Sequence, residues 1–347
     1  MRRLLLLGLA LALCGFSIGS PMVSFDGATQ WINSPALTPS DLHGKVVLVD
    51  FWEYTCLNCL RTLPYLREWY KRYHNDGFII IGVHTPEFDF SGQPAEVESA
   101  AKRLGVTWPV AVDDGRAIWN HYDIDEWPTE LLYDQTGHLV DVQLGEGNYP
   151  YTESKIQALL KAANPSLTLP PLMALLPQDS YDKPGAVCYP DTAEVLVGRR
   201  KIADAPTFGD PSTDLDYHDS GSHRDGAIYL NGYWHATQEA MEFGGGSGYF
   251  AMTYHAIEVT AVMRPGRGGA SRVVVTQDGK PLPQEDAGSD VHYDADGTAY
   301  IDVDASRSYN IVENKTFGTH DLHLSPQAYG VGIYDVDFES CEVPGSH

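Results

Sequence analysis

The chain has few basic residues for its length. Of its 347 residues, 23 are Lys or Arg and 47 are Asp or Glu, so the formal net charge is −24 at pH 7. A surface of this sign repels the phosphate backbone of nucleic acids and anionic lipid head groups. The composition therefore argues against binding to nucleic acid, and it indicates a soluble acidic surface that by itself names no partner.

Cysteines are also scarce. The five are Cys14, Cys56, Cys59, Cys188 and Cys341. A zinc site needs four ligands, normally with a second Cys or His pair, and only Cys56 and Cys59 form a close pair. The scarcity argues against zinc, and we expect neither a metal nor another cofactor.

Long apolar runs are lacking beyond the N-terminus. Two arginines followed by Leu4–Leu13 predict a secretory signal, because the run is too short for a standard membrane span. Cleavage after Gly19 would leave Ser20 as the mature N-terminus. A lipoprotein anchored at Cys14 is the alternative, which the bulky Leu13 disfavours. We expect an exported, periplasmic or extracytoplasmic protein, and export fits disulfide chemistry.

What is present is a buried-strand pattern over residues 45–51 that runs into Cys56-Leu57-Asn58-Cys59, followed by an amphipathic helix over 61–73. Two cysteines three apart at a helix start can close a small disulfide ring. The helix N-terminus offers unpaired N–H groups and a partial positive charge, which favour a thiolate at Cys56 and lower its pKa. We predict thiol–disulfide exchange, in which Cys56 attacks and Cys59 resolves the mixed disulfide.

Strand and helix patterns alternate in the first half of the chain. Further strands are expected at 78–83, 109–112, 129–133 and 138–144, and further helices at 94–104, 116–122 and 151–163. The predicted order is β-α-β-α-β-β-α. Residues 1–19 would be the signal peptide and residues 20–163 the redox domain.

Prolines crowd residues 164–190 and predict a stiff linker over 164–187. Residues 188–347 then show eight or so short strand patterns and no convincing helix, which predicts a β-sandwich of jelly-roll type. The expected strands are 229–233, 250–255, 257–263, 272–277, 299–303, 309–312, 320–324 and 330–338.

Four motifs carry a family resemblance: Leu48–Trp52, Thr55–Tyr65, Ile81–Phe88 and Trp127–Glu130. They resemble the thioredoxin superfamily, and within it the periplasmic TlpA-like proteins and the extracytoplasmic part of the DipZ family. The resemblance runs from about Phe25 to the end of the chain and is more distinctive in the first half. It implies a thioredoxin fold with a TlpA-type insertion, followed by the β-sandwich.

The resemblance also implies roles for single residues. Asp50 lies six residues before Cys56, where thioredoxins place a buried acid that can accept the proton of Cys59 through a water. A strand-edge Asp bonded to backbone is the alternative. Pro128 would be cis and would pack against the active disulfide, where the neighbouring backbone can align an incoming polypeptide. An ordinary trans proline at a strand start is the alternative.

Other side chains near the pair are candidates for smaller roles. The residues expected to line the approach to Cys56 are Trp52, Tyr54, Trp127 and Thr129, although two of the three aromatics could equally be core residues. Candidate tuners of the cysteine pair are Glu53, Glu87, Glu130 and His84, among which one sequence cannot choose.

The second half gives weaker signals. Cys188 and Cys341 flank its strands and could form a structural disulfide, with two buried free thiols as the alternative. Four aromatics could stack on a glycan or fill the core: Tyr229, Tyr233, Trp234 and Tyr249. His320 and His323 are three apart, which in a strand places them on opposite faces and argues against a shared metal.

We therefore expect an exported thiol–disulfide oxidoreductase that acts on client protein cysteines in the reducing direction. A thiol peroxidase is one alternative, but it would carry Thr where this chain has Glu53. A copper-delivery protein and a glycan-binding module with a secondary redox domain are others. The resembling family often adds a membrane electron-conducting part of CcdA type, so a separate membrane protein of that type is an expected electron donor.

Overall fold

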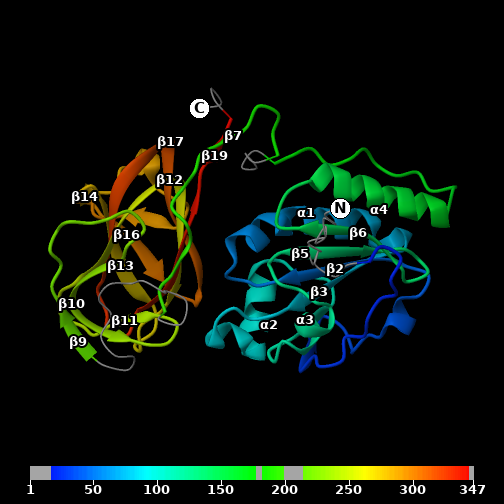
Figure 1. Ribbon diagram of the computed structural model, residues 1–347, viewed down its shortest axis with the longest axis horizontal. Helices are drawn as coiled ribbons and strands as arrows, with labels where there is room; N and C mark the ends of the chain where they lie inside the picture. Colours follow the sequence, from blue (N-terminus) through cyan, green and yellow to red (C-terminus); the bar gives the residue numbers. More distant parts are fainter. Residues whose placement is uncertain (1–16, 177–181, 199–213, 344–347) are drawn as a thin grey trace, which may run out of the picture. The chain divides into compact units, whose positions relative to one another are not determined.

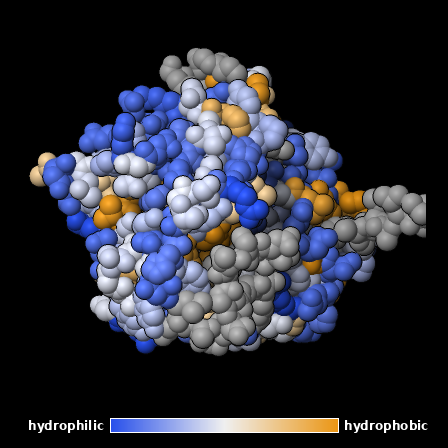
Figure 2. Space-filling view, turned by 60° about the vertical axis from the view of Figure 1, so that its left-hand side comes forward, coloured by the Kyte–Doolittle hydropathy of each residue, from blue (hydrophilic) through white to orange (hydrophobic). Residues whose placement is uncertain are grey.

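The computed structural model describes residues 17–176, 182–198 and 214–343. The predicted signal sequence and Cys14 fall on residues 1–16, outside the described part. Among the described residues, no helix combines the length and the apolar character that a bilayer span requires. The face drawn in Figure 2 is mostly hydrophilic, with apolar residues in scattered patches, as the net charge of −24 leads one to expect.

The first part of the chain is built on a six-stranded sheet with the order β1-β4-β3-β2-β5-β6 (Figure 1). Its strands are β1 (Gln30–Ile32), β2 (Val46–Trp52), β3 (Phe78–His84), β4 (Val110–Val112), β5 (Thr129–Tyr133) and β6 (Leu139–Leu144). Strands β2, β3 and β4 are parallel, and β1, β5 and β6 run antiparallel to their neighbours. Every residue of β2 is buried, which explains why all of its residues except Asp50 are apolar. The predicted thioredoxin-like α/β fold is confirmed.

Four helices accompany this sheet: α1 (Leu57–Tyr73), α2 (Pro94–Arg103), α3 (Ala117–His121) and α4 (Tyr149–Ala163). Figure 1 shows α1 and α4 beside one another on one side of the sheet, where the Tyr65 ring stacks on Tyr149 with centroids 3.6 Å apart. On the opposite face, Ile118 and Trp119 of α3 pack in a core with Phe25 and Phe51. Helix α1 begins four residues earlier than the sequence pattern predicts.

The segment after α4 is held against the helices of this part. The Met173 N–H donates to Glu153 Oε2 at 2.6 Å, and the Pro171 carbonyl accepts from Arg72. Glu153 is buried and also accepts from the Tyr73 hydroxyl. The first residues of the predicted linker therefore complete the hydrogen bonding of a buried carboxylate.

The second part of the chain consists of strands, which confirms the predicted all-β class. Its strands are β7 (Val187–Cys188), β8 (Val195–Leu196), β9 (Asp214–Tyr217), β10 (Tyr229–Ala236), β11 (Met241–Phe243), β12 (Tyr249–Arg264), β13 (Ser271–Gln277), β14 (Lys280–Pro281), β15 (Val291–Tyr293), β16 (Ala299–Val303), β17 (Arg307–Pro326), β18 (Gly332–Glu339) and β19 (Cys341–Glu342). All but β7 and β19 join one eleven-stranded antiparallel sheet around a single apolar core.

Two long strands, β12 and β17, run through much of this sheet and pair with each other. The sequence predicted two short strands in place of each. Their register shifts between Ala256 and Glu258, and a bulge of this kind lets a strand bend without ending. Along β17, Leu322 and Leu324 are buried in the core, so Asp321 and His323, which alternate with them, lie on the outer face.

Cys188 and Cys341 are joined by a disulfide and lie opposite each other in the β7–β19 pair. The bond links the beginning and the end of the described all-β part.

Candidate redox site

The Cys56–Cys59 pair forms a disulfide at the junction of β2 and α1. Cys56 stands directly before Leu57, the first residue of the helix, and its carbonyl accepts from the Leu60 N–H at 3.0 Å. The Cys59 N–H donates to Cys56 Sγ at 3.2 Å. Cys56 thus occupies the capping position of α1, and its sulfur satisfies one of the N–H groups that a helix start leaves unpaired.

The two sulfur-bearing residues differ in exposure. Cys56 is half-buried, whereas Cys59 is fully buried. A client sulfur can reach only an accessible thiol, and a helix N-terminus stabilises negative charge on a sulfur placed there. The arrangement suits attack by Cys56 and later resolution by Cys59.

Asp50 lies on β2 directly opposite Glu130 on β5. Asp50 is fully buried and Glu130 is 4% exposed. Neither oxygen of Asp50 has a hydrogen-bond partner among the described residues, and the same holds for Glu130 Oε1. The two buried carboxyl groups are therefore neighbours in the sheet, and the pair lacks the hydrogen-bond donors that would stabilise both as anions.

Burial raises the pKa of Asp50 to about 7. Burial also raises the pKa of Glu130 to about 8, and the negative charges of Asp50 and Asp141 add to this rise. Because the two groups are coupled, the pair retains a proton near neutral pH and titrates as a unit. An acid poised in this range can take up and return protons at physiological pH.

Glu53 and His84 form a second buried polar pair, at the ends of β2 and β3. His84 Nε2 lies 3.6 Å from Glu53 Oε1, and both side chains are fully buried. The Trp52 ring meets the His84 ring edge-on, with centroids 5.2 Å apart. The two indole rings of Trp52 and Trp108 pack closely against Gly82. A Cβ at residue 82 would come within 3.2 Å of both indole nitrogens, so a larger residue would crowd them.

The Trp127–Pro128 peptide bond is cis. The Trp127 ring is half-buried and packs against Trp119 at 4.4 Å, with the Arg116 guanidinium 5.0 Å from its centroid. Thr129 is buried, and its hydroxyl donates to the Glu126 carbonyl.

Trp52 and Tyr54, which were expected to line the approach, are both buried. Of the predicted aromatics in the first part, only Trp127 keeps partial exposure. Glu87, another predicted tuner, is half-buried just after β3.

The four aromatics predicted for a glycan do not gather on one surface. Trp234 is buried in the core, and its indole N–H donates to the Asn231 carbonyl. Tyr229 and Tyr249 are half-buried and stack on histidine rings. Tyr233 is 41% exposed, so it alone of the four offers a broad open ring face.

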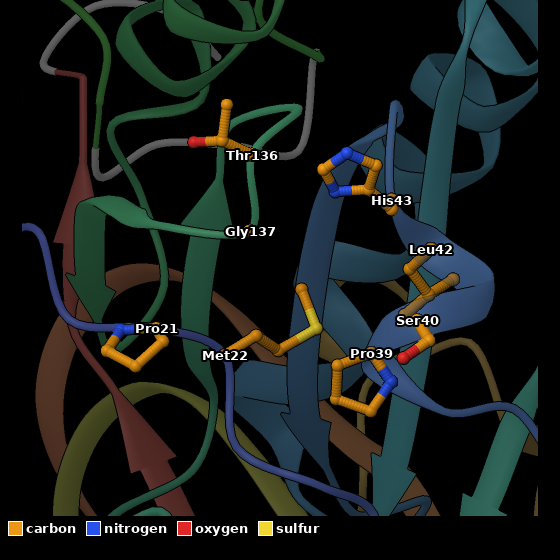
Figure 3. Close-up of a pocket in the computed structure, with 8 residues that line it drawn as sticks. All are labelled: Pro21, Met22, Pro39, Ser40, Leu42, His43, Thr136 and Gly137. Carbon is orange, nitrogen blue, oxygen red and sulfur yellow. The ribbon is translucent and has the colours of Figure 1, made fainter.

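A shallow pocket of about 450 Å³ lies elsewhere, between the segment at Pro21 and Met22, the turn at Pro39–His43 and the turn at Thr136 and Gly137 (Figure 3). These turns lie at the start of β2, the end opposite the one that leads to Cys56. No residue of the redox site lines this pocket.

The sequence alone does not show that Asp50 and Glu130 are neighbours. Asp50 and Glu130 each interrupt an apolar strand, which signals a buried acid in both places. Only the antiparallel register of β2 and β5 reveals that the two acids are direct neighbours.

Comparison with known proteins gives two family matches. Residues 32–160 match the Redoxin family, and residues 192–338 match the family described as "Thioredoxin like C-terminal domain". Protein DipZ of Mycobacterium tuberculosis is 35% identical over 268 residues, which cover 74% of this chain and 36% of that protein. The chain thus spans only about a third of the length of this relative.

Two further proteins cover the first part. The thiol–disulfide oxidoreductase ResA of Bacillus anthracis is 32% identical over 125 residues, covering 36% of this chain and 67% of that protein. A thiol–disulfide isomerase structure from Corynebacterium glutamicum is similar at 23% identity and a TM-score of 0.38, covering 41% of this chain and 96% of the other.

Proposed function

Because this chain belongs to the TlpA-like branch of the thioredoxin superfamily, we propose that it is an exported thiol–disulfide oxidoreductase acting on client protein cysteines. The observation that carries the proposal is the asymmetric pair itself. Cys56 is accessible and caps a helix, whereas Cys59 is buried one turn further on. Thiol–disulfide exchange needs one accessible thiolate and one resolving thiol held close to it.

In the reducing direction, the Cys56 thiolate attacks one sulfur of a client disulfide. A mixed disulfide forms, and the other client sulfur leaves as a thiolate. Cys59 then loses its proton and attacks Cys56 Sγ, so that the second client sulfur leaves and the Cys56–Cys59 disulfide forms. Two electrons pass to the client, and the oxidised pair must be reduced again by another dithiol.

Asp50 is the proposed acceptor of the Cys59 proton, through a water molecule. Its pKa of about 7 lies close enough to that of an ordinary thiol for transfer to be efficient in either direction. Glu130 keeps this proton within the pair, because ionising both buried acids at once is costly. The role of Glu130 is to position and hold the proton rather than to contact the client.

Clients would approach at the cis Pro128, where the backbone of the bend before β5 would pair with an extended client peptide. The partially exposed Trp127 and the cysteine pair would flank that strand. A membrane protein of CcdA type is the proposed source of electrons, since the described part of this chain supplies no further dithiol: its other two cysteines form the Cys188–Cys341 disulfide.

The test is reduction of a protein disulfide by the mature chain. Catalytic amounts of the wild-type protein, with dithiothreitol as electron source, should accelerate reduction of insulin. Cys56→Ser should abolish the acceleration, and the Cys188→Ser, Cys341→Ser double variant should retain it if it folds. Equal activity of wild-type and Cys56→Ser protein would refute the proposed function.

Glycan binding by the all-β part is a second candidate function. Two exposed tyrosines would bind the glycan, in place of the four aromatic residues predicted from the sequence. Tyr233 and Tyr329 are 41% and 50% exposed. A Cβ on Gly244 would collide with the Tyr233 ring, and Gly245 has Tyr329 as its nearest neighbour. Each ring is packed on one side, Tyr233 against Gly244 and Tyr329 under the Arg267 guanidinium at 5.0 Å, so a sugar ring would stack on the other side. Tyr233→Ala and Tyr329→Ala should each weaken retention on an immobilised cell-wall glycan if this proposal holds.

A further inference from the structure

A cluster of histidine and aspartate side chains lies on the outer face of β12 and β17. Asp321 and His323 alternate along β17 with two leucines of the core, and His223 reaches them from the loop before β10. One donor atom from each of these three residues lies within 4.8 Å of the others. His223 and Asp321 are 98 residues apart in the sequence.

We propose that His223, Asp321 and His323 bind a divalent transition-metal ion, with zinc as the reference case. His223 Nδ1 lies 2.6 Å from Asp321 Oδ1, and His323 Nε2 lies 2.9 Å from Asp321 Oδ2. In a tetrahedral zinc site with bonds of about 2.0–2.1 Å, neighbouring donors are about 3.3 Å apart. The two nitrogen–oxygen contacts would lengthen by about half an ångström, and the two imidazole nitrogens, which lie within 4.8 Å of each other, would adjust to the same separation.

The surroundings of His223 match those of a metal ligand. Its other nitrogen, Nε2, lies 2.9 Å from Asp219 Oδ2, and the Tyr249 hydroxyl donates to that same oxygen at 2.9 Å. The Asp219 side chain is only 2% exposed. Metal-binding histidines regularly use their second nitrogen in this way, because the carboxylate fixes the ring and increases its basicity.

Aromatic rings hold the two imidazoles in place. Tyr229 stacks on His223 with centroids 4.4 Å apart, and Tyr249 stacks on His323 at 4.5 Å. The Thr253 hydroxyl donates to Asp321 Oδ1 at 3.3 Å. A site whose ligands are already oriented loses little conformational entropy when the ion binds.

The donor set selects the class of metal. Two imidazole nitrogens and one carboxylate suit zinc and its neighbours, whereas calcium and magnesium prefer oxygen ligands only. Once bound, the ion would fasten the loop before β10 to the sheet.

Isothermal titration with zinc chloride tests the proposal directly. The mature chain is used without an affinity tag, stripped with a chelator, and with both disulfides closed so that no thiolate competes. One zinc ion should bind per chain. His323→Ala and Asp321→Asn should each weaken binding at least about tenfold, and Asp219→Asn should weaken it by about tenfold. The matched control is His320→Ala, which removes a histidine of the same strand that pairs with Asp278 instead.

Cobalt(II) gives a second readout that does not depend on comparing affinities. The wild-type chain should show the intense visible absorption of a tetrahedral cobalt site, and folded Asp321→Asn, verified by circular dichroism, should not. The proposal is overturned if the wild-type chain binds no zinc, if His323→Ala binds it as tightly as wild type, or if His320→Ala loses it equally. Tighter binding of calcium than of zinc would also overturn it. None of these results depends on thiol–disulfide activity.

Discussion

Asp50 on β2 and Glu130 on β5 are direct cross-strand neighbours with buried carboxyl groups, and both oxygens of Asp50 and Oε1 of Glu130 lack a hydrogen-bond partner among the described residues. A single buried acid in this place can serve as a proton acceptor. A second one beside it changes the electrostatics, because the negative charge of Asp50 adds to the rise in the pKa of Glu130. The pair therefore binds and releases a proton close to neutral pH.

The first prediction concerns the rate of exchange. Asp50→Asn keeps the shape of the side chain but cannot accept a proton, so exchange with a model disulfide should slow several-fold between about pH 6 and 9. Stopped-flow tryptophan fluorescence measures this rate. Asp123→Asn, which removes the same charge from an exposed position, should leave it unchanged. A rate for Asp50→Asn equal to wild type across this range would return Asp50 to a structural role.

The second prediction concerns stability against pH. The folded-state pKa values of Asp50 and Glu130 are raised to about 7 and about 8, so the folded chain binds more protons than the unfolded chain between about pH 4 and 8. The free energy of unfolding of the first part should therefore fall as the pH rises through this window. Glu130→Gln should flatten the dependence and stabilise the protein at pH 8, by up to about 4 kcal/mol.

Urea unfolding of the wild-type and variant proteins at a series of pH values provides the measurement. Equal slopes against pH would show that the pKa of Glu130 does not differ between the folded and the unfolded protein.

The third prediction distinguishes the two cysteines. Cys59→Ser should accumulate mixed disulfides with a reducible client, because the attacking sulfur remains and the resolving one is gone. Cys56→Ser should accumulate none, since Cys59 is buried. Non-reducing electrophoresis with mass spectrometry identifies the adducts. Equal trapping by both variants, or a titration that finds Cys59 to be the more acidic thiol, would contradict the assignment.

The fourth prediction concerns where the redox domain ends. A fragment of residues 20–163 lacks the Met173 N–H that donates to the buried Glu153, whereas a fragment of residues 20–173 retains it. The longer fragment should be more stable by about 1–3 kcal/mol, the usual effect of leaving a buried group short of a partner. It should also keep an exchange rate close to that of the mature chain. A folded but inactive longer fragment would mean that the second part contributes to the chemistry.

Much of the first part could be predicted from the sequence because its signals are local. The sequence predicts a strand at 129–133, the bounds that β5 has, since a proline precedes it and a turn motif follows. The sequence pattern begins this helix at residue 61, after the cysteine motif, whereas α1 begins at Leu57 and its first turn already contains Cys59. In the second part, the sequence predicts two short strands where β17 is one long strand, because polar residues lie near its middle.

Apart from the Cys188–Cys341 disulfide, which the sequence suggests, contacts between distant segments could not be predicted. His320 and His323 do point to opposite faces of β17, as their spacing indicates. The relevant partner of His323 is instead Asp321, two residues away on the same face, together with His223 from a loop 98 residues earlier. Register and loop placement are properties of the fold as a whole, so one sequence without that fold does not reveal them.

The most direct test of the central claim is the equilibrium of the Cys56–Cys59 pair with glutathione. The mature chain is incubated in buffers of graded reduced and oxidised glutathione, acid-quenched, alkylated and analysed by mass spectrometry. We predict a single two-electron couple at Cys56 and Cys59. Its reduction potential should lie below about −230 mV, as expected of a reductant, and Cys188 and Cys341 should stay oxidised throughout. A Cys56–Cys59 pair that does not exchange with glutathione at all would contradict the account.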